Sequence, residues 1–171
     1  MSEPAPSLLL LIPAYNEQDR ILPTLRQYAE HLRQHHPGPA RIVVVLNGCR
    51  DNTLGVVRDA EARWPLISHL EFPGRIGKGG ALIEGMKLAP SADLVGYVDA
   101  DGATPPHAFM DLVRRCAAGE GDCLIASRWM PGAVVTQKQP DDRRFASRLF
   151  HLVVEALFWM GIHDTQCGAK V

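Results

Sequence analysis

Two runs of consecutive apolar residues constrain the fold of this 171-residue chain more than any other feature of it. The first run, 8–12, is stopped by Pro13, and the second, 42–46, is rich in β-branched residues. Uninterrupted runs of this length predict strands that are buried on both faces of a sheet. The segment 17–35 between them can form a helix, so the three pieces predict a β-α-β unit with parallel strands.

The alternation of strand and helix continues along the chain. Further strands are predicted near 67–70, 94–98 and 123–126, and further helices near 53–64, 78–88, 107–118 and 143–160, with a loop at 131–140. Apolar strands separated by helices predict an α/β fold with an open, mainly parallel sheet flanked by helices. The length, and the lack of a visible repeat or linker, predict a single domain over residues 1–171.

Composition excludes some classes of partner. The chain has 18 Lys and Arg against 19 Asp and Glu, so its overall charge does not favour nucleic acid or an anionic membrane. The four cysteines are scattered without a metal-binding spacing, which is typical of a reduced, cytoplasmic setting. The apolar stretch 149–162 contains His151 and Glu155 and is shorter than the ~20 residues that a spanning helix needs. We therefore expect that the chain as given does not cross a bilayer.

Two carboxylates with one residue between them, Asp99 and Asp101, follow the predicted strand 94–98. Residues two apart in an extended chain point the same way, so both could bind one divalent cation. Hard oxygen ligands suit Mg²⁺ or Mn²⁺, with a substrate phosphate completing the shell, better than Zn²⁺. The same residues also fit an ordinary turn that caps the next helix, as the following Pro105 and Pro106 suggest.

Ligands of open parallel sheets bind beyond the carboxyl ends of the strands, where the candidate loops are 13–17, 47–52 and 99–104. Six short motifs also occur along the chain in a recognisable order. They are 12–17 (IPAYNE), 47–53 (NGCRDNT), 77–81 (GKGGA), 99–101 (DAD), 127–128 (SR) and 164–170 (DTQCGAK). Together they resemble the family 2 glycosyltransferases, which have the GT-A fold, a Rossmann-like α/β sheet. Within that family the motifs are most similar to dolichyl-phosphate glucosyltransferases, with dolichyl-phosphate mannosyltransferases close behind.

The resemblance covers about residues 8–171 and implies a metal-dependent, inverting enzyme. Such an enzyme transfers a hexose, here glucose in preference, from a nucleotide diphosphate sugar to a polyprenyl (dolichyl-type) phosphate. UDP-glucose is favoured over GDP-mannose as donor, and the expected location is the cytoplasmic face of a membrane, with peripheral membrane contact. The alternatives within the family are mannosyl transfer from GDP-mannose and transfer to a saccharide hydroxyl.

The resemblance also assigns roles to residues of the donor site. The residues that it implies for donor binding are Pro13, Tyr15, Glu17, Asn47, Lys78, Asp99 and Ala100. Asp101, together with Asp99, would hold the Mg²⁺ or Mn²⁺ that neutralises the leaving diphosphate, unless Asp99 reaches the ribose instead.

Several of these residues have ordinary structural interpretations as well. Glu17 also fits the first turn of a helix, and Lys78 also fits a solvated helix start. Asn47 stands where the family usually has an acidic residue. Its amide is both a donor and an acceptor, so it could still hydrogen-bond a base edge, but it lacks the negative charge. We interpret Asp51, in the same loop, as a cap of the following helix.

The acceptor side is inferred from arginines and one carboxylate. Arg128, Arg143 and Arg144 are candidates for the acceptor phosphate, because a guanidinium donates two parallel hydrogen bonds to it. A phosphate acceptor is already anionic and needs no general base, so Asp164 either acts as a base for another acceptor or orders its loop. The predicted helix 143–160 is amphipathic, which suits a membrane interface or simply a cover for the sheet.

Two hypotheses from other functional classes also fit the sequence. A haloacid-dehalogenase-type phosphatase also uses a DxDG motif at a strand end, although there the motif closes the first strand and continues directly to Thr. A non-catalytic, nucleotide-sugar-binding fragment is the second, because the chain stops at Val171 whereas the resembling family continues. We therefore treat the domain as possibly truncated at its C-terminus.

Overall fold

The computed structural model describes residues 5–127 and 167–171. By its internal contacts the chain divides into two compact units, residues 1–124 with 168–171, and residues 125–167. The sheet and its helices belong to the first unit. That the whole chain forms a single domain stays a prediction.

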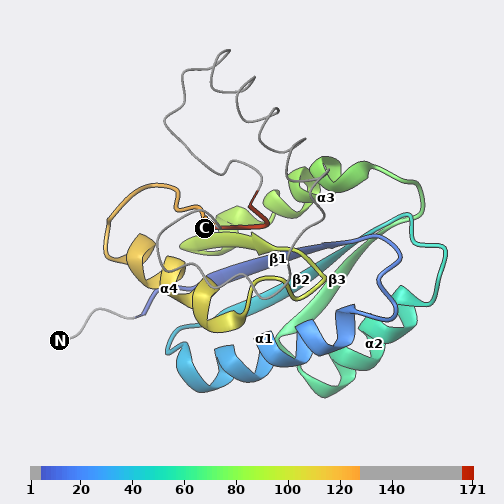
Figure 1. Cartoon of the computed structure of the whole chain (residues 1–171), viewed down its shortest axis with the longest axis horizontal. Helices are drawn as coiled ribbons and strands as arrows, with labels where there is room; N and C mark the ends of the chain where they lie inside the picture. The colour runs from blue at the N-terminus through green and yellow to red at the C-terminus, as the bar shows by residue number, and fades with distance from the viewer. Residues whose placement is uncertain (1–4, 128–166) are drawn as a thin grey trace, which may run out of the picture. The chain divides into compact units, whose positions relative to one another are not determined.

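Five strands form one sheet in the order β3-β2-β1-β4-β5 (Figure 1). Their bounds are β1 Leu8–Ala14, β2 Ala40–Asn47, β3 Ile67–Phe72, β4 Leu94–Val98 and β5 Ala169–Lys170. The first four strands run parallel, and the short β5 pairs with β4 in the antiparallel sense. The predicted α/β fold with an open, mainly parallel sheet is confirmed.

Helices cover both faces of this sheet. They are α1 Ile21–His35, α2 Thr53–Arg63, α3 Gly77–Met86 and α4 Pro106–Ala117, with a single 3-10 turn at Ala89–Ser91. Helix α1 packs between α2 and α4 on one face, while α3 packs against β1 and β2 on the other (Figure 1). Strands β1 and β2 are therefore covered from both sides, which explains their uninterrupted apolar sequence.

The core beneath α3 shows how the pleat sorts residues. Leu9 and Leu11 of β1 and Val43 and Val45 of β2 form one buried cluster with Ala81 of α3. These alternate residues face α3, and the residues between them face the opposite layer. This part of the core therefore lies along the middle of the two central strands, between them and α3.

Two boundaries differ from the sequence predictions. Helix α1 begins at Ile21 rather than at Glu17, because residues 18–20 form a turn ahead of it. The backbone N–H groups of Glu17 and Gln18 are bound by the side chains of Thr53 and Asp51. The strand predicted at 123–126 is not continuous in the described structure, although Leu124 exchanges two backbone hydrogen bonds with Val171. The predicted loop 131–140 and helix 143–160 lie outside the described residues. In the ranges 5–127 and 167–171, no helix combines the length and apolar character needed to span a bilayer.

Candidate active site

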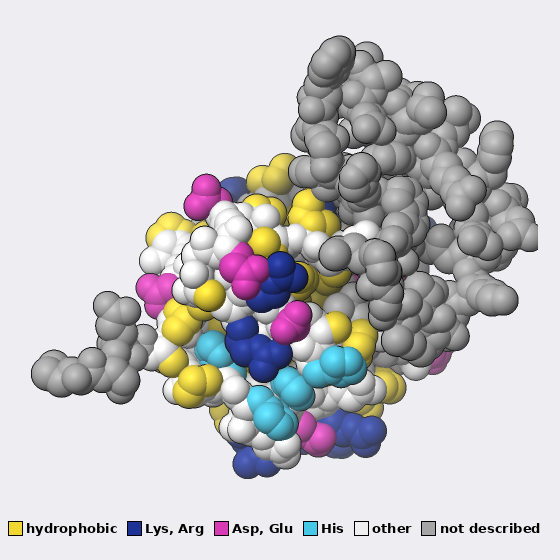
Figure 2. Space-filling view, turned by 60° about the vertical axis from the view of Figure 1, so that its left-hand side comes forward, with side chains coloured by type: hydrophobic (Ala, Val, Ile, Leu, Met, Phe, Trp, Pro, Cys, Tyr) yellow, Lys and Arg dark blue, Asp and Glu magenta, His cyan; other side chains and the backbone are white. Residues whose placement is uncertain are grey.

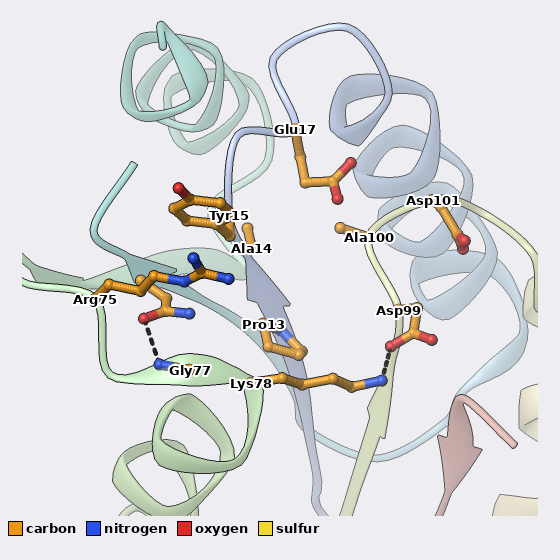
Figure 3. A pocket seen from close by; sticks show the side chains of 11 residues that line it. Pro13, Ala14, Tyr15, Glu17, Arg75, Gly77, Lys78, Asp99, Ala100 and Asp101 are labelled. Atoms are coloured by element: carbon orange, nitrogen blue, oxygen red, sulfur yellow. Dashed lines mark hydrogen bonds and ion pairs between the residues drawn. The ribbon is translucent and has the colours of Figure 1, made fainter. Parts of the chain in front are cut away.

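A pocket of about 320 Å³ opens at the carboxyl ends of the central strands (Figure 3). It is lined by Pro13, Ala14, Tyr15, Glu17, Asn47, Arg75, Gly77, Lys78, Asp99, Ala100 and Asp101. These residues come from the end of β1, the end of β2, the connection from β3 to α3, and the loop after β4. The structure thus brings together all seven residues predicted for the donor and also Asp101, at the edge of the sheet where open parallel sheets bind ligands.

Glu17 is the most enclosed carboxylate of the pocket. Its side chain is 16% exposed, and Arg20 Nη2 donates a 2.9 Å hydrogen bond to Oε1. Burial raises the pKa of Glu17 above its usual value, against the lowering effect of Arg20, and the nearby carboxylates Asp101 and Asp51 raise it further. Because Glu17 precedes α1, its interpretation as a residue of the first helical turn is wrong. Its side chain instead lines the pocket, with Ala100 between it and Asp101 (Figure 3).

Asp51 ties the loop after β2 to the loop after β1. Its Oδ1 accepts hydrogen bonds from the Thr53 N–H at 3.1 Å and the Thr53 hydroxyl at 2.5 Å, and its Oδ2 accepts from the Gln18 N–H at 3.2 Å. Slight burial opposes ionisation, but these hydrogen bonds outweigh it and lower the pKa of Asp51. The N-cap position of α2 is Asn52, whose side chain makes no capping hydrogen bond, so Asp51 is not the cap residue and binds the first N–H of the helix from one position earlier. The Thr53 hydroxyl also accepts the Glu17 N–H at 2.8 Å, so the same contacts place Glu17.

Asn47 holds the start of α3. Its side-chain carbonyl oxygen accepts the N–H of Ile76 at 2.6 Å and of Gly77 at 3.0 Å, and the residue is only 4% exposed. Two N–H donors at this position require an oxygen acceptor there, which directs the NH₂ group of Asn47 elsewhere. An amide can therefore replace the acidic residue that the family usually has, at least in organising this loop.

Lys78 and Asp99 form an ion pair across the pocket. Lys78 Nζ lies 2.5 Å from Asp99 Oδ1, and the two side chains are 52% and 36% exposed (Figure 3). The backbone at Gly168 lies against the other oxygen of Asp99, since a Cβ at Gly168 would be 2.2 Å from Oδ2. Lys78 is therefore a pocket residue rather than only a solvated lysine, and Asp99 contacts protein groups through both oxygens.

The acidic loop does not continue the strand. β4 ends at Val98, a turn follows at Ala100 and Asp101, and Asp101 Oδ1 accepts the N–H of Ala103 at 3.0 Å. Asp99 points toward Lys78 whereas Asp101 lies on the other side of Ala100 (Figure 3). Asp99 and Asp101 therefore do not have the extended backbone that was expected to point both carboxylates the same way.

Within the described ranges, no cluster of three or more acidic, His or Cys side chains is arranged to hold a metal ion. Glu17, Asp99 and Asp101 nevertheless supply hard oxygen donors to one pocket, and this donor type fits Mg²⁺ or Mn²⁺. The predicted ligand set of Asp99 and Asp101 stays a prediction.

Arg75 is the one charged residue among three pocket residues that the sequence did not predict. Its guanidinium carbon lies 4.5 Å from the centroid of the Tyr15 ring, a cation–π distance. A Cβ on Gly48, whose φ is +65°, would lie 2.7 Å from the Arg75 backbone nitrogen, so these two loops touch. The only sequence signal was an arginine just before the glycines of 77–81, in a loop to which no partner could be assigned. Ala14 and Gly77 also line the pocket without having been predicted.

A second group of titratable side chains lies on the helical layer of α1 and α4, and its members do not line the pocket. The His31 and His35 rings stack with centroids 4.3 Å apart, and histidines gather near basic side chains on this surface (Figure 2). Burial lowers the pKa of His31, and the charges of His35, His107 and Arg114 lower it further. These histidines therefore supply no ligand or proton-transfer group to the pocket that holds Glu17, Asp99 and Asp101.

The predicted acceptor residues Arg128, Arg143 and Arg144, and the predicted catalytic residue Asp164, lie outside the described residues. Their roles stay predictions. The described geometry consequently bears on the donor half of the expected site.

Comparison with known proteins decides the family. The family description "Glycosyl transferase family 2" matches residues 10–170. The chain belongs to this family. Glycosyl transferase family 2 consists of enzymes that transfer sugars, which confirms the resemblance seen in the six motifs and excludes the phosphatase alternative.

Relatives in this family include lipid-phosphate sugar transferases. The chain is 35% identical to glycosyltransferase AglD of Haloferax volcanii, over 94% of this chain and 26% of that protein. It is 34% identical to a dolichyl-phosphate beta-glucosyltransferase of Trichomonas vaginalis, over 94% of this chain and 50% of that protein. It is 30% identical to a polyprenol monophosphomannose synthase of Mycolicibacterium smegmatis, over 98% of this chain and 62% of that protein. The chain thus spans between a quarter and about three fifths of the length of these relatives.

The fold of this family 2 member has solved counterparts. Glucosyl-3-phosphoglycerate synthase of Mycobacterium tuberculosis, in a complex with Mn²⁺, UDP and glucosyl-3-phosphoglycerate, superposes with a TM-score of 0.70. The identity is 20%, and the match covers 96% of this chain and 56% of that one. At this identity the likeness shows the GT-A-like fold.

Proposed function

We propose that this chain forms the donor-binding domain of a metal-dependent, inverting glycosyltransferase that moves a hexose from a nucleotide diphosphate sugar to a polyprenyl phosphate. The observation that carries the proposal is one pocket that combines the carboxylates Glu17, Asp99 and Asp101 with the cations Lys78 and Arg75. Carboxylates suit a divalent cation, and the cations suit the phosphates or the base of a nucleotide. The family and the names of its relatives support the same class of reaction.

At the diphosphate end of the pocket, Asp101 and Asp99 would hold Mg²⁺ or Mn²⁺. The bound ion would neutralise the diphosphate as the bond to the sugar breaks. The ammonium of Lys78, which now contacts Asp99, is half exposed and can donate to a phosphate oxygen. Asp99 alternatively accepts from the ribose and leaves Asp101 as the principal ligand.

At the nucleoside end, Tyr15 and Arg75 offer a stacked ring and guanidinium, and the NH₂ group of Asn47 can donate to a carbonyl of a base. Uracil and guanine both carry such a carbonyl. We favour UDP-glucose because dolichyl-phosphate glucosyltransferases are prominent among the relatives. GDP-mannose is the alternative, which the relative named polyprenol monophosphomannose synthase supports.

On the acceptor side we propose that Arg128, Arg143 and Arg144 bind the phosphate of the lipid, at the cytoplasmic face of a membrane. A phosphate monoester is anionic at neutral pH, so its oxygen attacks without a general base. Asp164 would then order its loop. If the acceptor were a saccharide hydroxyl, Asp164 would be the candidate base.

Thermal stabilisation by nucleotides tests the donor proposal directly. We expect UDP-glucose or UDP to raise the melting temperature only with Mg²⁺ or Mn²⁺, because the metal links the diphosphate to Asp101. A ligand at ~100 times its Kd adds about 2.7 kcal/mol, which a melting curve resolves. GDP-mannose and GDP, measured in parallel, identify the base.

The Asp101→Asn variant should lose this stabilisation. Asp111→Asn is the matched control, because Asp111 is an exposed carboxylate on α4 that does not line the pocket. Stabilisation by GDP-mannose alone would reassign the donor. If no nucleotide raised the melting temperature, the proposed donor site would be contradicted. If nucleotides stabilised the chain but the protein that carries it transferred no sugar, a non-catalytic binding module would be supported.

A further inference from the structure

Two buried hydroxyl groups of α1 donate hydrogen bonds to the acidic loop 99–104. Thr24 Oγ1 donates to the carbonyl oxygen of Ala100 at 3.0 Å, and Tyr28 Oη donates to the carbonyl oxygen of Thr104 at 2.9 Å. The two donors are four residues apart and therefore lie on one face of the helix. Their acceptors are also four residues apart, so one turn of α1 spans the loop.

Packing fixes both donors. Thr24 is 3% exposed and Tyr28 is 1% exposed. The Tyr28 ring packs edge-to-face on Phe109 of α4, with ring centroids 5.9 Å apart, and Phe109 in turn packs against the backbone of Gly96 in β4. Burial raises the pKa of Tyr28 far above the working range, so the phenol always carries the proton that it donates. Both hydroxyls are therefore held in place to donate to the carbonyl oxygens of Ala100 and Thr104.

The contact falls on the peptide that sets the direction of Asp101. Ala100 lies between the two carboxylates, so a bond to its carbonyl oxygen fixes the peptide plane from which Asp101 follows. Gly102 has a φ of +72°, and a Cβ there would lie 3.1 Å from Thr24 Oγ1, so the turn passes directly over this hydroxyl. Loop backbone without a ladder of its own depends on such side-chain partners for its shape.

We propose that Thr24 and Tyr28 are positioning residues that hold loop 99–104 in the shape that binds the metal–diphosphate. The part concerning the ligand rests on the proposed function. Neither side chain lines the pocket, so both act through the loop rather than by touching the donor. Outer partners of this kind typically change metal affinity by about 10–100-fold when they are removed.

The test separates loop shape from ligand binding by two measurements. Thr24→Val keeps the shape of the side chain without the hydroxyl, Tyr28→Phe removes only the phenol oxygen, and Thr24→Ser restores a donor. Leu32→Val is the matched control, because Leu32 is a buried apolar residue of the same helix. Amide hydrogen exchange of residues 99–104, measured without ligand, reports the stability of the loop conformation. Titration with Mn²⁺ in the presence of UDP, followed by electron paramagnetic resonance, reports the ligand.

We expect Thr24→Val and Tyr28→Phe to speed amide exchange in residues 99–104 selectively and to weaken Mn²⁺ binding about tenfold. Thr24→Ser should restore both, and Leu32→Val should change neither selectively. Wild-type exchange and affinity in both hydroxyl-deleting variants would overturn the positioning role while leaving the proposed function intact. Faster exchange spread evenly over the chain, as expected of a merely destabilised protein, would also overturn it. A wild-type chain that binds no Mn²⁺ with UDP or GDP would instead overturn the proposed function and, with it, the role toward the ligand.

Discussion

At the scale of single residues, the pocket holds a carboxylate in surroundings that disfavour its charge. The side chain of Glu17 is largely buried, and its partner Arg20 is 60% exposed, so water weakens the ion pair that should compensate for burial. Asp101 and Asp51 add negative charge nearby. Burial therefore dominates and raises the pKa of Glu17, a pattern that is common where a protein keeps a charged group for a ligand.

This environment predicts how Glu17→Gln changes stability with pH. A carboxyl whose pKa is raised in the folded state contributes stability below its unfolded pKa and loses that contribution as pH rises through the folded pKa. At pH 7 the ionised Glu17 therefore costs free energy, and Glu17→Gln should raise the free energy of unfolding. The gain should shrink as pH falls toward the usual value of 4.5. Urea unfolding of both proteins at pH 7 and pH 4 measures it.

The result that would contradict this prediction is a variant less stable than the wild type at pH 7, because the Arg20 ion pair would then outweigh burial. Arg20→Gln serves as the control, since it removes the same ion pair and leaves the buried carboxylate in place. Its stability should fall relative to the wild type at pH 7.

Residue roles were predicted from the sequence where a motif located them at a strand end. Tyr15, Glu17 and Asp101 line the pocket because each follows a strand that the apolar pattern predicts, and Lys78 lines it from the start of α3. Arg75 was not predicted because no sequence motif links the segment after β3 to Tyr15. Only the folded loops bring its guanidinium over that ring.

At the scale of elements, β4 is packed so tightly that it has no room for a side chain at Gly96. A Cβ there would lie 2.7 Å from the carbonyl oxygen of Lys170 in β5 and 2.8 Å from Cζ of Phe109 in α4. Gly96→Ala should therefore lower the free energy of unfolding by about 1–3 kcal/mol, as overpacking of a core usually does. Urea unfolding measures this loss.

A glycine with open space around it is the matched control for Gly96→Ala. Gly79 in α3 has no atom within 4 Å of where its Cβ would be. Because Ala is the better helix former, Gly79→Ala should raise the free energy of unfolding by up to about 1 kcal/mol. If both substitutions changed the free energy of unfolding equally, the conformational preference of alanine over glycine, and not packing around β4, would account for the effect.

The elements themselves were predictable to different degrees. All four parallel strands were predicted to within two residues. In β1 and β2 the signal is an uninterrupted apolar run, because these strands are buried on both faces. β5 was not predicted, since two residues, Ala169 and Lys170, cannot show a periodicity and owe their conformation to the edge of β4. The start of α1 was misplaced because residues 18–20 form a turn before the helix, which the sequence pattern does not distinguish from the helix itself.

At the scale of the whole molecule, the predicted donor and acceptor residues fall in different stretches of the chain. The donor residues lie between 13 and 101, and all line the described pocket, whereas Arg128, Arg143, Arg144 and Asp164 lie between 125 and 167. Binding of a nucleotide sugar should therefore be separable by mutation from its transfer to an acceptor.

The class of acceptor determines how much Asp164 should matter. Removal of a general base typically slows a reaction about 10²–10⁴-fold, and a hydroxyl acceptor needs such a base whereas an anionic phosphate does not. With a polyprenyl phosphate acceptor we expect Asp164→Asn, in the protein that carries this chain, to lower kcat less than about tenfold and Asp101→Asn to lower it far more. Formation of the glycosylated lipid phosphate, followed by mass spectrometry with UDP-glucose and Mg²⁺ present, measures both variants. Nucleotide-induced stabilisation of Asp164→Asn is the control for donor binding. An Asp164→Asn variant that binds donor normally yet transfers nothing would argue for a base, and hence for a hydroxyl acceptor in place of the phosphate.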